Sequence, residues 1–254
     1  MKIIAYFDIQ QKNISFIDKA KSDLFLTASR EVIEKWIYDL NTKIIENRRM
    51  KHYFMQNNND YQSGTFLYSH CMLSTVKSVF LLFDCIKKEK SEDAWMALMD
   101  AYDYLDVAEL FLEKYRLQSD GFIPFKEKIK NIEHTIFPNN LLYVSPGAKE
   151  TLGECNICGN NFFDCSHIER DIYNGIFCQR INREILEADH IALVDNPRDR
   201  RCVIRTIQDK HGSLLDVFTR KRTAPKNEES EHIVLNVILH TFRRPEFNKI
   251  TQLI

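Results

Sequence analysis

The first half of the chain is marked by apolar residues that recur every three or four positions, which is the spacing of one face of an α-helix. A short run that resembles a strand, residues 3–9, precedes this pattern. The first helical face consists of Val32, Ile33, Trp36, Ile37, Leu40 and Ile44. Ser29 is placed to cap this helix, with Glu31 in its first turn. The asparagine-rich stretch QNNNDYQSG then predicts a loop.

The same spacing predicts two further long helices, one over about residues 65–86 and one that begins after Ser91. Only KKEKS separates them. So short a connection forces two neighbouring helices to run antiparallel. With a shorter helix near residues 123–136, these segments predict an α-helical domain over residues 1–137, built on an antiparallel helix hairpin.

The pattern changes after residue 137. The stretch PNNLLYVSPGAKETLGE has two prolines, two glycines and no helical spacing, so residues 138–150 are interpreted as a linker. Short β-rich runs at 191–194 and 202–207 follow, together with the sequence Tyr173-Asn174-Gly175, in which Asn-Gly favours a tight hairpin. The segment SEHIVLNVILHTFRR fits either a helix or a buried strand. Residues 151–254 are therefore expected to form a small α+β domain.

Composition and charge narrow the classes of function. The chain has 254 residues, of which 44% are hydrophobic, and its net charge is −1. It is thus able to bury a core, and it is not a general polycation that would bind nucleic acid or anionic lipid over its whole surface. The N-terminal apolar run is too short for a secretion signal, and no run approaches the roughly 20 residues of a membrane span. A cytoplasmic protein with no membrane partner is expected.

The most specific feature is the segment CNICGNNFFDCSHIERDIYNGIFC, residues 155–178. Cys155 and Cys158 are two residues apart and are followed by Gly159, which is the pattern of a zinc knuckle. Further donors stand at Cys165, His167 and Cys178. A tetrahedral metal site needs four ligands, so four of these five residues are predicted to bind a metal.

Zn²⁺ is the cofactor that this donor set favours, because thiolates are soft ligands and suit zinc better than magnesium or calcium. An iron–sulfur cluster is the main alternative, and the histidine argues against it. Since the protein supplies at least four donors, no coordination position need be kept for water, and a structural site is favoured over a catalytic one. In a reducing compartment the seven cysteines are expected as thiols or metal ligands.

Residues 137–207 resemble a group of largely uncharacterised bacterial proteins that carry a Cys-x2-Cys-Gly, Cys-x-His and Tyr-x-Gly-x2-Cys segment before a Val-x-Asn-Pro stretch. The resemblance is carried by Cys155, Cys158, Cys165, His167, Tyr173, Gly175 and Cys178, with ALVDNPRDRRCVI after them. It implies zinc and a bacterial or phage origin, and it supplies no known reaction. Arg170 stands where glycine is expected in that group.

The first functional hypothesis is a zinc-stabilised binding or adaptor protein, within a phage-related or defence system, whose partner is another protein or a nucleic acid. Residues 198–226 contain nine lysines or arginines and three aspartates, a local net charge of +6 that could neutralise phosphates. The candidate contacts in it are Arg198, Arg200, Arg201, Arg220, Lys221 and Arg222. The competing interpretation of this segment is a solvated basic loop.

The second hypothesis is a metal-dependent nuclease related to the HNH type. Its candidate residues are Asp189, His190, Asn196 and His211. His190 would be the general base, Asp189 or His211 would hold a divalent cation, and Asn196 would orient the loop. Against this hypothesis, the second Cys-x2-Cys pair expected downstream is absent and only Cys202 is present.

A third hypothesis places an activity in the helical half, as in helical ribonucleases that use an arginine and a nearby histidine. Arg48, Arg49 and His52 are close to that pattern, but their spacing is short. Cations near the C-terminal end of a helix explain them more simply. His70 and Cys71, also in the helical half, are interpreted as packing residues.

Overall fold

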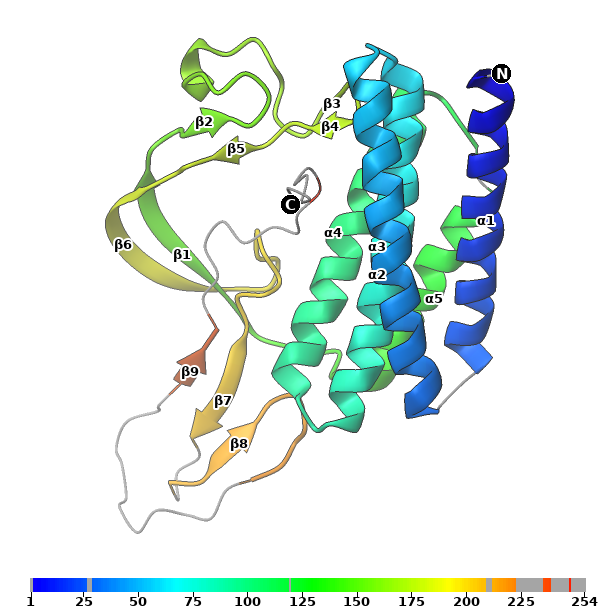
Figure 1. The fold of residues 1–254 in the computed structure, drawn as a ribbon. Coiled ribbons are helices and arrows are strands. Elements are labelled where there is room, and N and C mark those ends of the chain that lie inside the picture. Colours follow the sequence, from blue (N-terminus) through cyan, green and yellow to red (C-terminus); the bar gives the residue numbers. More distant parts are fainter. Residues whose placement is uncertain are drawn as a thin grey trace. The chain divides into compact units, whose positions relative to one another are not determined.

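The computed structural model describes residues 2–26, 29–118, 120–208, 212–222, 235–238 and 247. Five helices form an N-terminal helical region, and a strand-rich region with short antiparallel sheets follows it, which confirms the predicted fold class (Figure 1). The chain divides into two compact units. One comprises Met1–Gly121, Glu154–Ile181 and Arg244–Ile254, and the other Phe122–Gly153 and Asn182–Arg243. The domain limits at residues 137 and 150 stay a prediction, because these units combine segments that are distant in the sequence.

Four long helices make up most of the first unit. They are α1 (Lys2–Leu26), α2 (Arg30–Gln56), α3 (Asp60–Lys87) and α4 (Ser91–Lys114). The central helix is α3, which packs against each of the other three and has more than half of its residues buried. Residues 88–90 join α3 to α4, so the predicted hairpin of two long helices is confirmed. Because α3 already begins at Asp60, the predicted loop shrinks to a turn at residues 57–59.

The expectation of a strand at residues 3–9 is wrong, since these residues belong to helix α1. Isoleucines at positions 3 and 4 favour a strand locally. The buried residues of the whole segment, however, fall at alternating steps of three and four, which bury one side of a helix against its neighbours. They are Tyr6, Gln10, Asn13, Ile17, Ala20 and Leu24.

Polar contacts fix how α1 lies along α2. The buried amide of Asn13 donates to Oδ1 of Asn47 over 3.0 Å, and Asn47 in turn donates to the carbonyl of Phe66 on α3 over 2.6 Å. At the other end, the indole of Trp36 donates to Asp23 over 3.0 Å. Because the buried amides of Asn13 and Asn47 are hydrogen-bonded, these contacts set the register of the helices without a large penalty.

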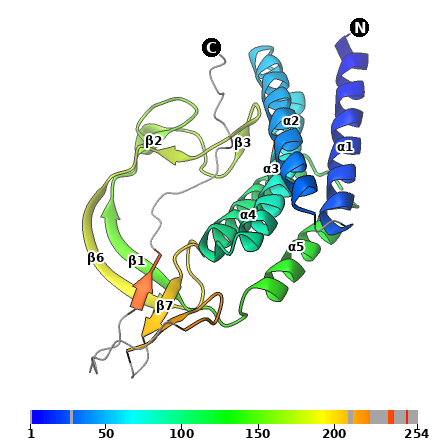
Figure 2. The ribbon, with the colours of Figure 1, turned by 60° about the horizontal axis from the view of Figure 1, so that its bottom comes forward.

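The second unit consists of α5 (Phe122–Ile136) and two sheets. Strands β1 (Tyr143–Glu150) and β6 (Ile185–Val194) pair antiparallel in a long curved ribbon (Figure 2). Strands β8 (Leu214–Asp216), β7 (Ile204–Gln208) and β9 (Leu235–Val237) form the second sheet in that order. The stretch 138–150, expected as a linker, thus contains a paired strand. In the segment that fitted helix or strand, residues 235–237 are a strand, and residues 230–234 and 239–244 lie outside the described part.

Within the described residues, one helix meets the length and composition of a membrane span, namely α3. In its most apolar window 78% is buried inside the protein. A core helix of a soluble protein passes the same test for the same reason.

Candidate metal centre

The cysteine segment, residues 154–181, belongs to the first unit and contains four short strands. Strand β2 (Glu154–Cys155) pairs with β5 (Arg180–Ile181), and β3 (Ile172–Tyr173) pairs with β4 (Ile176–Phe177). After Cys155 the chain turns tightly. The amide of Gly159 donates to the carbonyl of Cys155 over 2.8 Å, and Gly159 has φ +73°. This is the turn expected of a knuckle, in which glycine accepts a left-handed conformation at low cost.

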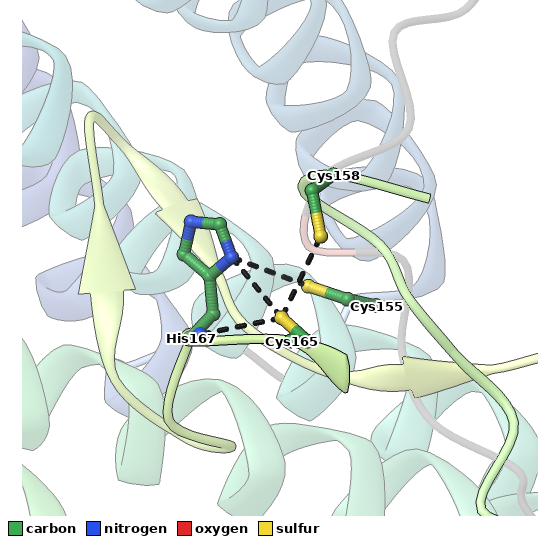
Figure 3. A group of neighbouring side chains, drawn as sticks. All are labelled: Cys155, Cys158, Cys165 and His167. Atoms are coloured by element: carbon green, nitrogen blue, oxygen red, sulfur yellow. Dashed lines mark hydrogen bonds between the residues drawn. The ribbon is translucent and has the colours of Figure 1, made fainter. Parts of the chain in front are cut away.

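A short 3-10 helix, η1 (Phe162–Asp164), precedes the next two ligand candidates, Cys165 and His167. Its first turn is capped by Asn161, whose Oδ1 accepts from the amide of Phe163 over 2.9 Å. This helix delivers Cys165, and the amide of His167 then donates to the Cys165 sulfur over 3.2 Å. As a result, both side chains turn toward the knuckle (Figure 3).

Cys155, Cys158, Cys165 and His167 converge, with their ligand atoms all within 4.8 Å of one another. The Sγ atoms of Cys158 and Cys165 are 3.5 Å apart. Nδ1 of His167 is 3.3 Å from Sγ of Cys165 and 3.7 Å from Sγ of Cys155. A tetrahedral ion bound at about 2.3 Å from sulfur and about 2.0 Å from nitrogen separates its ligands by roughly 3.5–3.8 Å. The group could therefore hold a metal ion with little movement.

Cys178, the fifth predicted donor, lies outside this group of four and is fully buried. Burial is the main cause that raises the pKa of its thiol, and the neighbouring Cys155, to which it hydrogen-bonds, raises it further, to about 12. A neutral thiol at this place is suited to support the sulfur of Cys155 from outside the ligand set.

Backbone amides favour the thiolate form of Cys155, which is the form that binds a metal. Burial opposes ionisation of this thiol, but the amides of Cys158 and Ile157 direct hydrogen bonds at its sulfur and lower its pKa to about 6. Burial instead raises the pKa of Cys165, to about 11, with Cys155 and Cys158 contributing. Thiols with such different pKa values are expected where several sulfur atoms lie close together, because ionisation of one thiol opposes ionisation of the next. A divalent cation removes that repulsion.

The hairpin between β3 and β4 attaches this segment to the helices of the same unit. The amide of Asn174 donates to the Asp60 side chain over 2.6 Å, and its side chain donates to the carbonyl of Met55 over 3.0 Å. Gly175 has φ +73°, and a Cβ atom at this position would lie 2.8 Å from the backbone of Ser63. The predicted Asn-Gly turn thus serves as a close contact with the start of α3.

A second attachment comes from the end of α4. The ammonium group of Lys114 pairs with Asp171 at 3.1 Å, donates to the carbonyl of Ile172, and lies 5.1 Å from the ring centroid of Tyr173. The Tyr173 ring packs edge-on against His167 at 4.8 Å. One aromatic side chain therefore connects a ligand candidate to a helix. No local sequence signal marks Lys114 for this role, because its partners are more than 50 residues away.

Arg170, where glycine is expected in the resembling proteins, has φ +74°. Its amide donates to the carbonyl of Cys178 over 2.9 Å, which closes the loop between His167 and β3. A left-handed conformation costs a residue with a side chain about 1–2 kcal/mol. The turn forms here without glycine, at that local cost.

The residues of the nuclease hypothesis belong to the second unit, whereas the cysteine segment belongs to the first. Nδ1 of His190 is 3.0 Å from Asp189, and these side chains on β6 are 62% and 75% exposed. The His190 ring lies over Gly147 of the paired strand. Asn196 is exposed in a bend, and His211 lies outside the described residues.

The six basic candidates fall into two sets. Arg201 is 2% exposed and pairs with Asp199 at 3.2 Å, and Arg200 forms an ion pair with Glu133. The exposed set consists of Arg198, Arg220, Lys221 and Arg222. The last three, called the basic turn below, directly follow the turn at residues 217–219 after β8. The amide of Arg220 donates to the carbonyl of Asp216, and Arg222 forms an isolated bridge with Leu215.

No family model, curated protein or solved structure matches this chain.

Proposed function

We propose that Cys155, Cys158, Cys165 and His167 bind one structural Zn²⁺ ion. The observation that carries this proposal is the convergence of four protein donors at separations that suit a tetrahedral ion. Four protein ligands leave no position for a reactive water, which favours a structural site. The same segment has little apolar core of its own, so metal binding would supply much of its folding free energy.

Metal content tests this directly. Elemental analysis of the purified chain is expected to give one zinc per chain, and Cys158→Ser is expected to lose most of it. Cys85→Ser is a matched control, because Cys85 is a free thiol on α3, outside the group of four. A chain without zinc, or equal zinc in all three proteins, would count against the site.

The protein as a whole is proposed to act by binding, as an adaptor, rather than by turnover. The metal would hold residues 154–181, and the contacts of Asn174 and Lys114 would keep this segment on the ends of α3 and α4. Such a construction gives a rigid surface without a reactive group at the metal. The proposed setting, a phage-related or defence system of a bacterium, rests on the sequence resemblance, and a cytoplasmic location stays a prediction from the sequence.

The proposed partner of the basic turn is nucleic acid. Arg220, Lys221 and Arg222 are exposed directly after a turn whose backbone is held by Asp216, and Asp216 itself pairs with Arg205. Arg200 and Arg201 are excluded from the proposed contact surface because Arg201 is buried and Arg200 is half-buried against Glu133. A triple change of Arg220, Lys221 and Arg222 to Gln is expected to reduce retention on a nucleic-acid column and to flatten its salt dependence. Unchanged retention would remove this partner from the proposal.

A second candidate is the HNH-like nuclease, which is favoured by one observation, the hydrogen-bonding contact between Asp189 and His190. Incubation of the chain with plasmid and Mg²⁺ or Mn²⁺ tests it. Cleavage that His190→Ala abolishes would place the nuclease above the adaptor, and absence of cleavage would leave the adaptor alone.

A further inference from the structure

The four-helix unit holds a cluster of charged and polar side chains that the metal centre does not use. It lies where α2, α3 and α4 run together (Figure 1). At its buried end Lys51 is 2% exposed, His70 and Cys71 are fully buried, and Ser74 is 4% exposed. An apolar residue at any of these positions would avoid the free-energy cost of burying a polar group, so the fold alone does not account for these side chains.

The ammonium group of Lys51 uses only part of its hydrogen-bonding capacity within the described residues. The group has three donors, and its one hydrogen bond among the described residues goes to the carbonyl of Phe247, at 3.2 Å. Burial lowers its pKa to about 8. The nearby Cys71 is no effective counter-ion, because burial raises the pKa of its thiol to about 12. Among the described residues, the ammonium therefore has no buried anion beside it.

His70 is less satisfied still. Neither of its ring nitrogens has a hydrogen-bond partner within the described part of the chain. Burial lowers the pKa of the imidazole, and the positive charges of Lys51, Arg48 and Lys77 lower it further. The ring is thus neutral, with one unused donor and one unused acceptor. Buried polar groups without partners are rare in native proteins and are often explained by an ion or ligand.

The outer rim of the cluster is half-buried and mostly positive. Arg48, Lys77, Asp100 and Tyr104 all have intermediate exposure. Tyr104 hydrogen-bonds to Ser74 and stacks at a tilt 6.0 Å from His70. With Lys51, the charges that act on these groups are three cations and one carboxylate. Among the described residues, these groups therefore face more positive than negative charges.

We propose that this cluster binds the phosphate group of a small ligand, with Lys51 and His70 as the buried donors and Arg48 and Lys77 at the rim. A phosphate carries close to two negative charges and several acceptor oxygens, which matches an ammonium, an imidazole N–H and two further cations. The depth of Lys51 fits a small molecule and excludes a duplex. This site is independent of the proposed zinc site and of the basic turn.

Phe247 contacts two members of the cluster, Lys51 and Tyr104. Its carbonyl occupies one donor of Lys51, and its ring lies 5.3 Å from Tyr104 and 5.2 Å from Phe177. A carbonyl oxygen repels an anion, so the phosphate has to replace it. Removal of the Phe247 ring, which anchors that carbonyl, is therefore expected to increase phosphate affinity.

Calorimetric titration of the full chain with inorganic phosphate and with adenosine 5′-monophosphate tests the proposal, at constant ionic strength set with chloride. Saturable binding of either ligand is expected. In Lys51→Met the affinity should fall by at least about tenfold, the effect of one charge-assisted hydrogen bond. Lys35→Met, an exposed lysine on the same helix, should stay within about twofold. Phe247→Ala should bind more tightly than the unaltered chain.

Tyr104→Phe is the second variant, because it removes only a hydroxyl from the half-buried rim and should fold. It is expected to weaken binding by a smaller factor than Lys51→Met. Tighter binding of the nucleotide than of phosphate would identify a phosphate ester as the ligand class. No binding of either ligand, or equal affinity in Lys51→Met and Lys35→Met, would overturn the proposal.

Discussion

Ser63 and Asn174 are 111 positions apart in the sequence, and the hydroxyl of Ser63 donates to Oδ1 of Asn174 over 2.9 Å. Ser63 is fully buried in the first turns of α3, and Asn174 forms the turn between β3 and β4. The bond joins the helical core to the cysteine segment within one compact unit. The stability of the segment is therefore expected to depend on both its metal and this contact.

Two glycines of this segment provide a matched pair. Gly159 and Gly175 both have φ +73°, but a Cβ atom at Gly159 would meet nothing within 4 Å, whereas one at Gly175 would meet the Ser63 backbone at 2.8 Å. Gly159→Ala is expected to cost about 1–2 kcal/mol for the left-handed conformation. Gly175→Ala should cost at least about 1 kcal/mol more, because the backbone of α3 has to shift. Denaturant unfolding measures both, and equal costs would contradict the contact.

Two substitutions distinguish the proposed metal ligands from Cys178. Cys165→Ser is expected to reduce the zinc content strongly, whereas Cys178→Ala should keep about one ion per chain, because Cys178 lies outside the group of four. Loss of the thiol beside Cys155 should instead weaken zinc retention against a competing chelator, by roughly 10-fold or more. Zinc content as low in Cys178→Ala as in Cys165→Ser would make Cys178 a ligand.

Chelation is expected to act locally. The helical core is apolar and fully buried at Phe66, Leu67, Trp95 and Leu98, and it contains no ligand of the proposed ion. Treatment with a strong chelator should therefore increase amide hydrogen exchange in residues 154–181 while the helical circular dichroism signal changes little. Cooperative loss of both signals would show instead that the core of the unit depends on the metal.

Lys51 predicts a rise of stability in alkaline solution. Its folded-state pKa, about 8, is below the value of 10.5 for a free lysine, so between these values the unfolded chain binds more protons than the folded chain. Below pH 8 the folded chain bears the full free-energy cost of burying a charged Lys51. This cost decreases as the pH rises toward 10.5. The gain relative to Lys51→Met is on the order of 3 kcal/mol at most. Urea unfolding of both proteins at several pH values measures it, and parallel curves would contradict the burial of a charged Lys51.

Periodicity was sufficient to predict α2, α3, α4 and α5, because each buries a regular stripe or most of its surface. It did not predict α1, where the residues that complete the stripe include the polar Gln10 and Asn13. Their burial depends on hydrogen bonds to other helices, such as Asn13 to Asn47, and no local pattern shows these.

The composition of the cysteine segment predicted a metal-binding cluster, since thiols and an imidazole at knuckle spacing have a strong chemical preference. It left open which donor is outside the group of four, because that depends on strand pairing around Cys178. His70 and Cys71 were interpreted as packing residues, and no pattern in the sequence marked Lys51 as their neighbour. The polar members of this cluster come from three helices, and only the tertiary structure brings them together.

The amide of Thr151 donates to the carbonyl of Glu184 over 2.9 Å, and the next residues on either side belong to the paired strands β1 and β6. Residues 151–184 thus leave and re-enter the ribbon at a single point, as an insertion does. Because its ends are already held together, ordering this insertion requires little further loop-closure entropy. A short turn that joins Glu150 to Ile185 should therefore remove the cysteine segment and leave the β1–β6 hairpin intact.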